Sequence, residues 1–207
     1  MSSDPVSDEV ARDPEFGVTA RYFGLQRQVL MYQWSRAGDG YSRSWSESWL
    51  DSAQFAPGHD NPAKLPLKSD RWIAGDIRID GKPLDARVIA ELGEWKSFRP
   101  NFSTLPANLA ATFQPEGDGL GSAENPMDPQ VGDLRIRWRE LMLPSLAGRV
   151  VLQDGRWVLG PQAQGAQTIS QESVGKGHGL LIGIGLLIVL LALAVIYRRH
   201  RHKPDNR

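Results

Sequence analysis

The chain has 207 residues, 24 basic and 24 acidic side chains, and no cysteine. Its formal net charge of zero excludes the basic excess of nucleic-acid-binding proteins, and the lack of cysteine excludes disulfides, thiolate metal sites and a cysteine nucleophile. The length outside an apolar C-terminal segment is that of one ordinary domain, which can bury a core without covalent cross-links.

Residues 1–15 form an acidic, proline-containing stretch that is poor in apolar side chains. This composition predicts a flexible lead. It has neither the basic start and apolar run of a signal peptide nor the length of apolar sequence that a membrane helix needs.

Residues 16–160 carry the patterns of a β-rich domain. Residues 18–34 combine aromatic and β-branched side chains in imperfect alternation, which favours a long strand. A turn signal follows at residues 37–40, and in residues 41–50 serine alternates with aromatic or charged side chains. These two segments predict a hairpin.

The middle of the domain mixes loop, strand and helix signals. Prolines and a glycine exclude regular structure in residues 54–67, whereas residues 72–79 fit a short strand. Asp85 is expected to cap a helix, because apolar side chains follow it at helical spacing. Residues 98–124 are expected to be mostly irregular, with one or two strands. The apolar side chains of the predicted helix are Val88, Ile89, Leu92 and Trp95.

The last part of the domain returns to strand patterns. Residues 133–140 alternate between apolar side chains and arginines, which predicts a half-buried strand. Residues 149–159 predict a second hairpin around Asp154 and Gly155. The Gln-, Gly- and Ser-rich residues 161–178 predict a flexible stalk.

Residues 179–197 are uncharged and apolar throughout. As a helix they would rise roughly 28 Å, close to the thickness of the hydrocarbon core of a bilayer, so they predict a transmembrane helix. Tyr197 would lie at the interface, and the basic tail of residues 198–207 begins with Arg198 and Arg199. Basic flanks stay cytoplasmic, which places the domain on the extracytoplasmic side, periplasmic or luminal. Because residues 1–15 supply no membrane segment, either the orientation rule fails for this chain or an upstream membrane segment exports the domain.

The expected fold class is therefore α+β: a β-rich extramembrane domain with at least one helix, plus a single C-terminal transmembrane helix. Gly179, Gly183 and Gly185 would allow a second membrane helix to approach closely. The expected partners are the lipid bilayer and another membrane helix or an envelope protein, and no nucleic acid.

His59 is the one histidine of the domain, which excludes a zinc site of the His/Cys type within it. Neither a G-x-S-x-G elbow nor a phosphate-binding glycine loop is present. We therefore expect no catalytic residue, no cofactor and no metal, and a loop in which His59 and Asn61 hydrogen-bond the backbone. The alternative is a membrane-surface hydrolase or lipid-modifying enzyme with His59 as base, assisted by Asp60 or Glu47.

Arg135, Arg137 and Arg139 form a basic stripe on one side of a predicted strand. The stripe predicts contact either with anionic lipid head groups or with a protein partner. The interpretation we favour is an exposed sheet face whose arginines form ion pairs with neighbouring residues.

Three short blocks stand out in the domain by their order and spacing. Their members are Met31, Tyr32, Gln33 and Trp34, then Gly58, His59, Asn61 and Pro62, and finally Val131, Gly132, Asp133, Leu134 and Arg135. Together with flanking residues from about 13 to 136, these blocks resemble the transmembrane protein 43 family.

The resemblance implies an N-terminal membrane helix, a large luminal or periplasmic domain, several C-terminal helices and a role in membrane organisation. It carries over no catalytic residues. The chain differs from that pattern because it starts without an apolar helix and has one predicted C-terminal helix. We therefore expect a non-enzymatic membrane-anchored protein whose extracytoplasmic domain binds or organises membrane or envelope partners.

Overall fold

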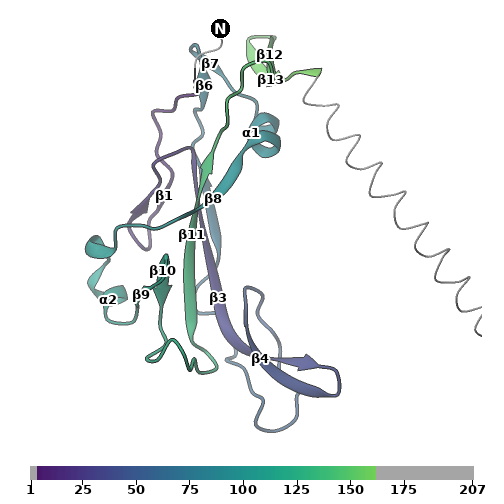
Figure 1. The fold of residues 1–207 in the computed structure, drawn as a ribbon, viewed down its shortest axis with the longest axis vertical. Helices are drawn as coiled ribbons and strands as arrows, with labels where there is room; N and C mark the ends of the chain where they lie inside the picture. Colours follow the sequence, from purple (N-terminus) through teal and green to yellow (C-terminus); the bar gives the residue numbers. More distant parts are fainter. Residues whose placement is uncertain (1–3, 162–207) are drawn as a thin grey trace, which may run out of the picture. The chain divides into compact units, whose positions relative to one another are not determined.

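The computed structural model describes residues 4–161, which Figure 1 draws in colour. They divide between two compact units, Met1–Ala147 with Leu152–Val158, and Gly148–Val151 with Leu159–Arg207. In the described part of the second unit, the amide of Gly160 donates to the carbonyl of Arg149 at 2.7 Å. The first unit contains the central β-sheet.

An antiparallel sheet of seven strands forms the centre of the first unit. Its two long strands, β3 (Gly24–Ala37) and β11 (Leu134–Met142), lie side by side (Figure 1) and pair from Leu134 opposite Met31 to Leu141 opposite Gly24. The remaining strands extend this pair on both sides: β4 (Gly40–Ser46) and β5 (Asp70–Ile73) on β3, and β8 (Glu94–Phe98) and β10 (Gly119–Gly121) on β11, with β9 (Gln114–Glu116) beyond β10.

Small elements accompany the central sheet. The described residues contain further strand pairs, β1 (Arg12–Asp13) with β2 (Val18–Thr19), β6 (Arg78–Ile79) with β7 (Lys82–Pro83), and β12 (Val150–Gln153) with β13 (Arg156–Leu159). They also contain the helices α1 (Ala86–Leu92) and α2 (Ala107–Ala110) and the 3₁₀ turn Phe102–Thr104. The predicted hairpin of residues 18–50 is confirmed as β3 and β4, and that of residues 149–159 as β12 and β13.

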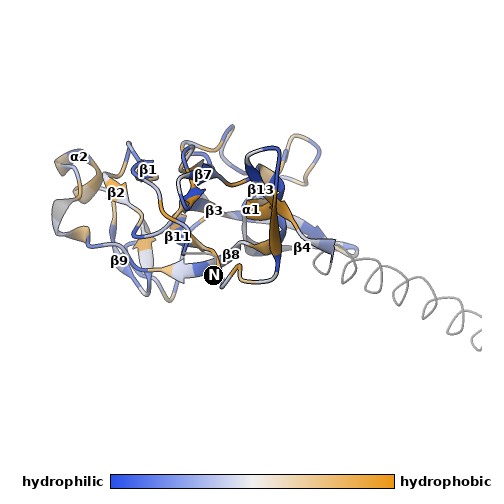
Figure 2. Ribbon diagram, turned by 90° about the horizontal axis from the view of Figure 1, so that it is seen from above, coloured by the Kyte–Doolittle hydropathy of each residue, from blue (hydrophilic) through white to orange (hydrophobic). Residues whose placement is uncertain are grey.

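Period-two alternation gives the sheet a covered face and an open face. Alternate side chains of β3 and β11 are buried, and they pack with aromatic and aliphatic side chains from the chain's first 20 residues and from the segment after β8. In Figure 2, hydrophobic residues (orange) and hydrophilic residues (blue) both occur along the strands of the sheet. The open face consists of the intervening side chains and their cross-strand neighbours: Gln26, Gln28, Leu30, Tyr32, Trp34, Arg43, Trp45, Arg71, Ser97, Arg135, Arg137 and Arg139.

The predicted helix is confirmed, but it is shorter than its apolar spacing suggested. The carboxylate of Asp85 caps α1 by accepting from the amide of Arg87 at 2.9 Å. Gly93 ends the helix, where a Cβ atom would lie 2.4 Å from the carbonyl oxygen of Ile89. Trp95 therefore lies on β8 and not on the helix.

The expected fold class is wrong in its membrane-spanning part. Among the described residues, neither helix is long and apolar enough to cross a membrane, and the fold is β-rich with short helices. Residues 179–197, the predicted transmembrane helix, lie outside the described residues, as do the tail of residues 198–207 and residues 162–178 of the predicted stalk.

The predicted flexible lead makes definite contacts from Val6 onward. Val6 forms a β-bridge with Arg78, and Asp13 is fully buried. The contacts of Val6 with Arg78 and of Asp13 with Trp138 join residues that are far apart in the chain, so no local pattern in residues 1–15 could have predicted them.

Candidate functional site

The three sequence blocks, which are far apart in the chain, meet at the β4 end of the central sheet. Asn61 connects two of them, because its Oδ1 accepts from the amide of Trp34 at 2.7 Å and its Nδ2 donates to the carbonyl of Trp34 at 3.0 Å. The same Nδ2 donates to the carbonyl of Leu50 at 3.1 Å. Asn61 thus acts as a side-chain substitute for a strand partner, and its loop is fixed to β3.

The third block joins β3 at the same edge, through Tyr32, two residues before Trp34. The amide of Gly132 donates to the carbonyl of Tyr32 at 2.9 Å, and the amide of Tyr32 donates to the carbonyl of Asp133 at 2.8 Å. Gly132 has a positive φ of 103°, and a Cβ atom there would approach Pro62 of the second block. The three blocks therefore form one packed junction, which combines hydrogen bonds of the Asn61 side chain to the backbone with backbone–backbone hydrogen bonds of Tyr32.

Gln33 is the fully buried polar side chain of this junction. Its Nε2 donates to the carbonyl of Ser48 at 3.0 Å, and its Oε1 accepts from the amide of Leu50 at 2.9 Å. Both ends of the amide are satisfied, so Gln33 holds the segment after β4 against the covered face. This role is structural.

His59 is held by ring contacts within the junction. Its ring stacks on Tyr41 with centroids 4.1 Å apart and lies edge-on to Trp34 at 4.6 Å, while its Nδ1 is 3.1 Å from the carbonyl oxygen of Ala56. Within residues 4–161, no carboxylate forms a hydrogen bond or an ion pair with it. Neither Asp60 nor Glu47 is brought to His59 as an acidic partner; Glu47 instead accepts from Gln28 at 2.7 Å.

The arginine stripe lines a cavity of about 430 Å³ on the open face. Arg135, Arg137 and Arg139 contribute three positive charges to its lining, and Asp118 contributes one negative charge. Gln28, Leu30, Trp45 and Ser97 complete the part of the lining that lies on the open face.

Arg135 fits the predicted ion-paired arrangement, but Arg137 and Arg139 do not. Arg135 forms an ion pair with Glu116 at 2.5 Å, and its guanidinium lies 4.0 Å from the ring centre of Trp45. Arg137 donates to the backbone carbonyl of Glu116 at 3.2 Å, and Arg139 donates to that of Trp95 at 2.7 Å. Neither forms an ion pair with a carboxylate of the described chain, and the three arginines outnumber Asp118, so the cavity lining has a net positive charge.

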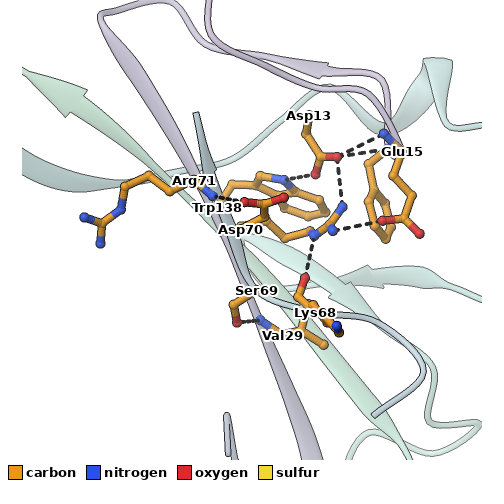
Figure 3. A network of polar contacts seen from close by, with 10 residues as sticks. Asp13, Glu15, Val29, Lys68, Ser69, Asp70, Arg71 and Trp138 are labelled. Atoms are coloured by element: carbon orange, nitrogen blue, oxygen red, sulfur yellow. Dashed lines mark hydrogen bonds and ion pairs between the residues drawn. The ribbon is translucent and has the colours of Figure 1, made fainter. Parts of the chain in front are cut away.

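A buried charge network lies on the covered face, and sequence reasoning did not predict it (Figure 3). Asp13 accepts from Arg27 at 2.8 Å, from the indole of Trp138 at 3.1 Å and from the amide of Glu15 at 3.1 Å. Arg27 also bonds Glu15 at 2.8 Å and the carbonyl of Lys68 at 3.1 Å. The one available signal was an arginine at an inward position of a predicted strand, which requires a buried partner.

A second buried carboxylate, Glu140, holds the start of β3 in the same way. It accepts from the amide of Arg21 at 2.6 Å and pairs with the Arg21 guanidinium at 2.8 Å. These bonds raise the pKa of Arg21, chiefly through the side-chain hydrogen bond to Glu140. Both networks stabilise the covered face and leave the open face as the candidate site.

The arrangement of His, Asp and Glu side chains bears on metal binding. Residues 4–161 contain no group of three or more His, Asp or Glu side chains placed to hold a metal ion. The predicted anchor residues Gly179, Gly183, Gly185, Tyr197, Arg198 and Arg199 lie outside the described residues.

Fold and site together define the class of protein: a β-sheet domain whose one face is buried under its own core and whose other face presents arginine and aromatic side chains. The chain belongs to the transmembrane protein 43 family, whose profile matches residues 31–151, more than half of the chain. The match includes all three sequence blocks; it starts at residue 31, after the first flanking residues of the resemblance, and extends past residue 136, where that resemblance ended.

Curated relatives agree with this assignment. Transmembrane protein 43 of Homo sapiens and that of Rattus norvegicus are each 26% identical to the chain, over 148 and 154 residues, and the Drosophila melanogaster homolog is 25% identical over 152 residues. The matches cover 62–63% of this chain but 36–38% of the relatives, so the chain spans little more than a third of their length. No solved structure matches the chain. Membership in this family supports a membrane location.

Proposed function

We propose that this chain is a non-enzymatic membrane protein whose described domain organises membrane partners by binding an acidic protein surface through its open face. The observation that carries the proposal is the pair Arg137 and Arg139, whose guanidinium groups bond backbone carbonyls and give the lining of a cavity a net positive charge. Charge complementarity of this kind selects acidic partners and speeds their encounter.

An extracytoplasmic position of the domain is part of the proposal. It rests on the resemblance to the transmembrane protein 43 family, which implies a large luminal or periplasmic domain. The chain lacks cysteine, so single cysteines at Ser42, on β4, and at Asn206 can be labelled with an impermeant maleimide in intact cells. We expect labelling at Ser42 and not at Asn206, and the reverse pattern would contradict the proposed side.

Partner binding is tested by charge reversal on the open face. A photo-crosslinking amino acid at Ser97, which lines the arginine cavity, should capture a membrane protein in native membranes. The double substitution R137E/R139E should lower the yield of that adduct about tenfold, because it repels an acidic partner. The matched control is Arg87→Glu on the exposed side of α1, which should leave the yield unchanged. An equal loss in both variants, or capture that is independent of the charges, would contradict the proposal.

The alternative of a hydrolase using His59 receives no support from the contacts of this residue. His59→Phe should keep the ring contacts and cost little stability, whereas His59→Ala should cost about 1 kcal/mol of unfolding free energy through lost aromatic packing. Both are measured by urea denaturation of the purified chain. If His59→Phe were as stable as the wild type and yet abolished the function of the gene in cells, the enzymatic alternative would regain support.

A further inference from the structure

A second cavity lies at the α1 end of the sheet, and its chemistry differs from that of the arginine cavity. It has a volume of about 530 Å³ and lies among β5, α1 and β8. Its floor and walls include Ile73, Ile89, Trp95 and Leu141. Volumes of roughly 300–1,000 Å³ are typical of pockets that bind small molecules. We call this cavity the apolar groove.

The sheet register explains why a hollow forms there. Ile73, Gly24, Leu141 and Trp95 make one row across β5, β3, β11 and β8. The second position of this row has no side chain, and a Cβ atom at Gly24 would lie 2.8 Å from the Cβ of Leu141. Leu141 therefore lies over the glycine and is buried, while a depression remains between Ile73 and the side chains of α1.

The apolar groove exposes hydrocarbon surface to solvent. Ile73 is 44% exposed, and Ile89 and Trp95 are half-buried. Figure 2 shows α1 as a mainly hydrophobic helix beside the sheet. Removing such surface from water contributes about 25 cal/mol per Å², so an apolar chain that fills the hollow is favoured.

The charged residues of the lining have a single sign. Arg71 and Arg156 are the two charged side chains among the described residues that line the groove, and no carboxylate belongs to the lining. The Arg71 guanidinium lies 4.9 Å from the ring centre of Trp95, which positions it against the apolar wall. In Figure 3, Arg71 extends away from Asp13 and Glu15, so the buried network does not occupy it.

We propose that the apolar groove binds a single-chain lipid with an anionic head group, the chain packing on Ile73, Ile89 and Trp95 and the head group contacting Arg71 and Arg156. An apolar hollow with two guanidinium groups matches an acidic amphiphile better than a neutral hydrocarbon, which leaves the charges unused, or a soluble anion, which leaves the apolar surface uncovered. The groove and the arginine cavity use different residues, so this binding and the proposed partner binding succeed or fail independently.

Photolabelling of the full chain in vesicles tests the proposal. The chain is reconstituted in phosphatidylcholine vesicles that contain a lysophosphatidic acid with a diazirine in its acyl chain, and the adducts are mapped by mass spectrometry. We expect adducts on peptides that contain Ile73, Ile89 or Trp95. The zwitterionic lysophosphatidylcholine probe with the same chain should label these peptides about tenfold less, because its choline ammonium offsets the phosphate charge that the two arginines contact.

Variants separate the contributions of the groove and of the charges. Ala90→Trp adds volume at an exposed position of α1 that lines the groove, so it should abolish labelling by both probes. R71E/R156E should lower labelling by the acidic probe about tenfold and leave the zwitterionic probe little changed. Arg87→Glu and Arg137→Glu lie outside the groove lining and should change neither.

Three results would overturn the proposal. These are equal labelling by the two probes, adducts that persist at full yield in Ala90→Trp, and absence of adducts from the groove peptides of the wild-type chain. The last result includes the case in which residues 162–207 or another protein fill the groove. Retained circular dichroism of each variant shows that lost labelling does not reflect unfolding.

Discussion

Individual residues matter most where a charge is buried. Asp13 is fully buried and Arg27 is 4% exposed, so each is stabilised only by its hydrogen-bonded partners. Asp13 joins β1 to β3 through Arg27 and to β11 through Trp138. A residue from the chain's acidic start thereby connects the two central strands.

Asp13→Ala should lower the unfolding free energy by about 3–5 kcal/mol, because it leaves the Arg27 charge buried with Glu15 as its remaining carboxylate partner. Urea denaturation followed by tryptophan fluorescence measures the change. Glu124→Ala, at an exposed loop position, is the control and should stay within about 0.5 kcal/mol. A loss of less than about 1 kcal/mol at Asp13 would show that the network contributes little to stability.

A second residue-scale prediction concerns the dependence of the N-terminal segment on pH. Asp76 accepts from the Ser7 hydroxyl and from the amide of Asp8 at 3.0 Å and that of Glu9 at 3.2 Å. These bonds hold the pKa of Asp76 below its ordinary value, the Ser7 contact having the largest effect. A depressed carboxyl pKa contributes stability above the unfolded-state pKa, and this contribution is lost as pH falls through the folded-state value.

Hydrogen exchange at the amides of Asp8 and Glu9 should therefore be more protected in the wild type than in Asp76→Asn at neutral pH. The difference should shrink as the solution is acidified past the pKa of Asp76. Comparing the two proteins at each pH cancels the intrinsic pH dependence of exchange. Protection that stays constant through this range would mean that the carboxylate does not hold the segment.

At the scale of elements, single side chains take the place of missing strand pairs. The loop that contains Asn61 is fixed to β3 through a side-chain amide that bonds both backbone groups of Trp34. Turn glycines fix the neighbouring connections: Gly132 adopts a positive φ before β11, and Gly38 has a φ of 59° in the turn between β3 and β4. The three sequence blocks thus encode one junction.

Asn61→Ala should destabilise the chain by about 2 kcal/mol, because the amide of Trp34 and two carbonyl groups lose their partner. Asn61→Asp keeps the acceptor for the Trp34 amide but sets a charged oxygen against the carbonyl oxygens of Trp34 and Leu50, so its loss should be larger than that of Asn61→Ala. Thermal unfolding of the two variants and of the wild type measures the order of their stabilities. Equal stability of Asn61→Ala and the wild type would show that water replaces these bonds at no cost.

At the scale of the whole described domain, the two faces of one strand have opposite roles. On β11, Glu140 is 2% exposed and bonded to Arg21, whereas Arg137 and Arg139 face the cavity on the open side. The covered face supplies the folding energy, and the open face is free to vary for binding.

The faces should respond differently to substitution. Glu140→Ala should cost about 3 kcal/mol, since it leaves the amide of Arg21 without its acceptor and empties a buried site. R137E/R139E should change the unfolding free energy by no more than about 1 kcal/mol, because partly exposed charges contribute little. Urea denaturation of both variants measures these changes in unfolding free energy. A large loss in the arginine variant would assign its side chains to stability and weaken the binding proposal.

The sequence by itself determined the two hairpins, the long strand β11 and the family, whereas the predicted strand of residues 72–79 is divided between β5 and β6. Alternation in residues 41–50 and 133–140 defined β4 and β11, because side chains of a strand point to opposite faces in turn. Asp85 and the apolar spacing after it predicted α1, and the three blocks identified the family whose profile matches residues 31–151. These features are local or depend on residue order, so they can be read without knowing which strands pair.

Only the tertiary structure decided which distant residues meet. The bonds of Asp13 to Arg27 and Trp138, and the row from Ile73 to Trp95 that leaves the apolar groove, depend on the antiparallel register of β3 with β5 and β11. A shift of one residue would exchange the faces of a strand, and no local pattern specifies the register between segments more than 100 residues apart. The requirement that buried charges find partners and that apolar side chains pack together selects that register in the folded chain.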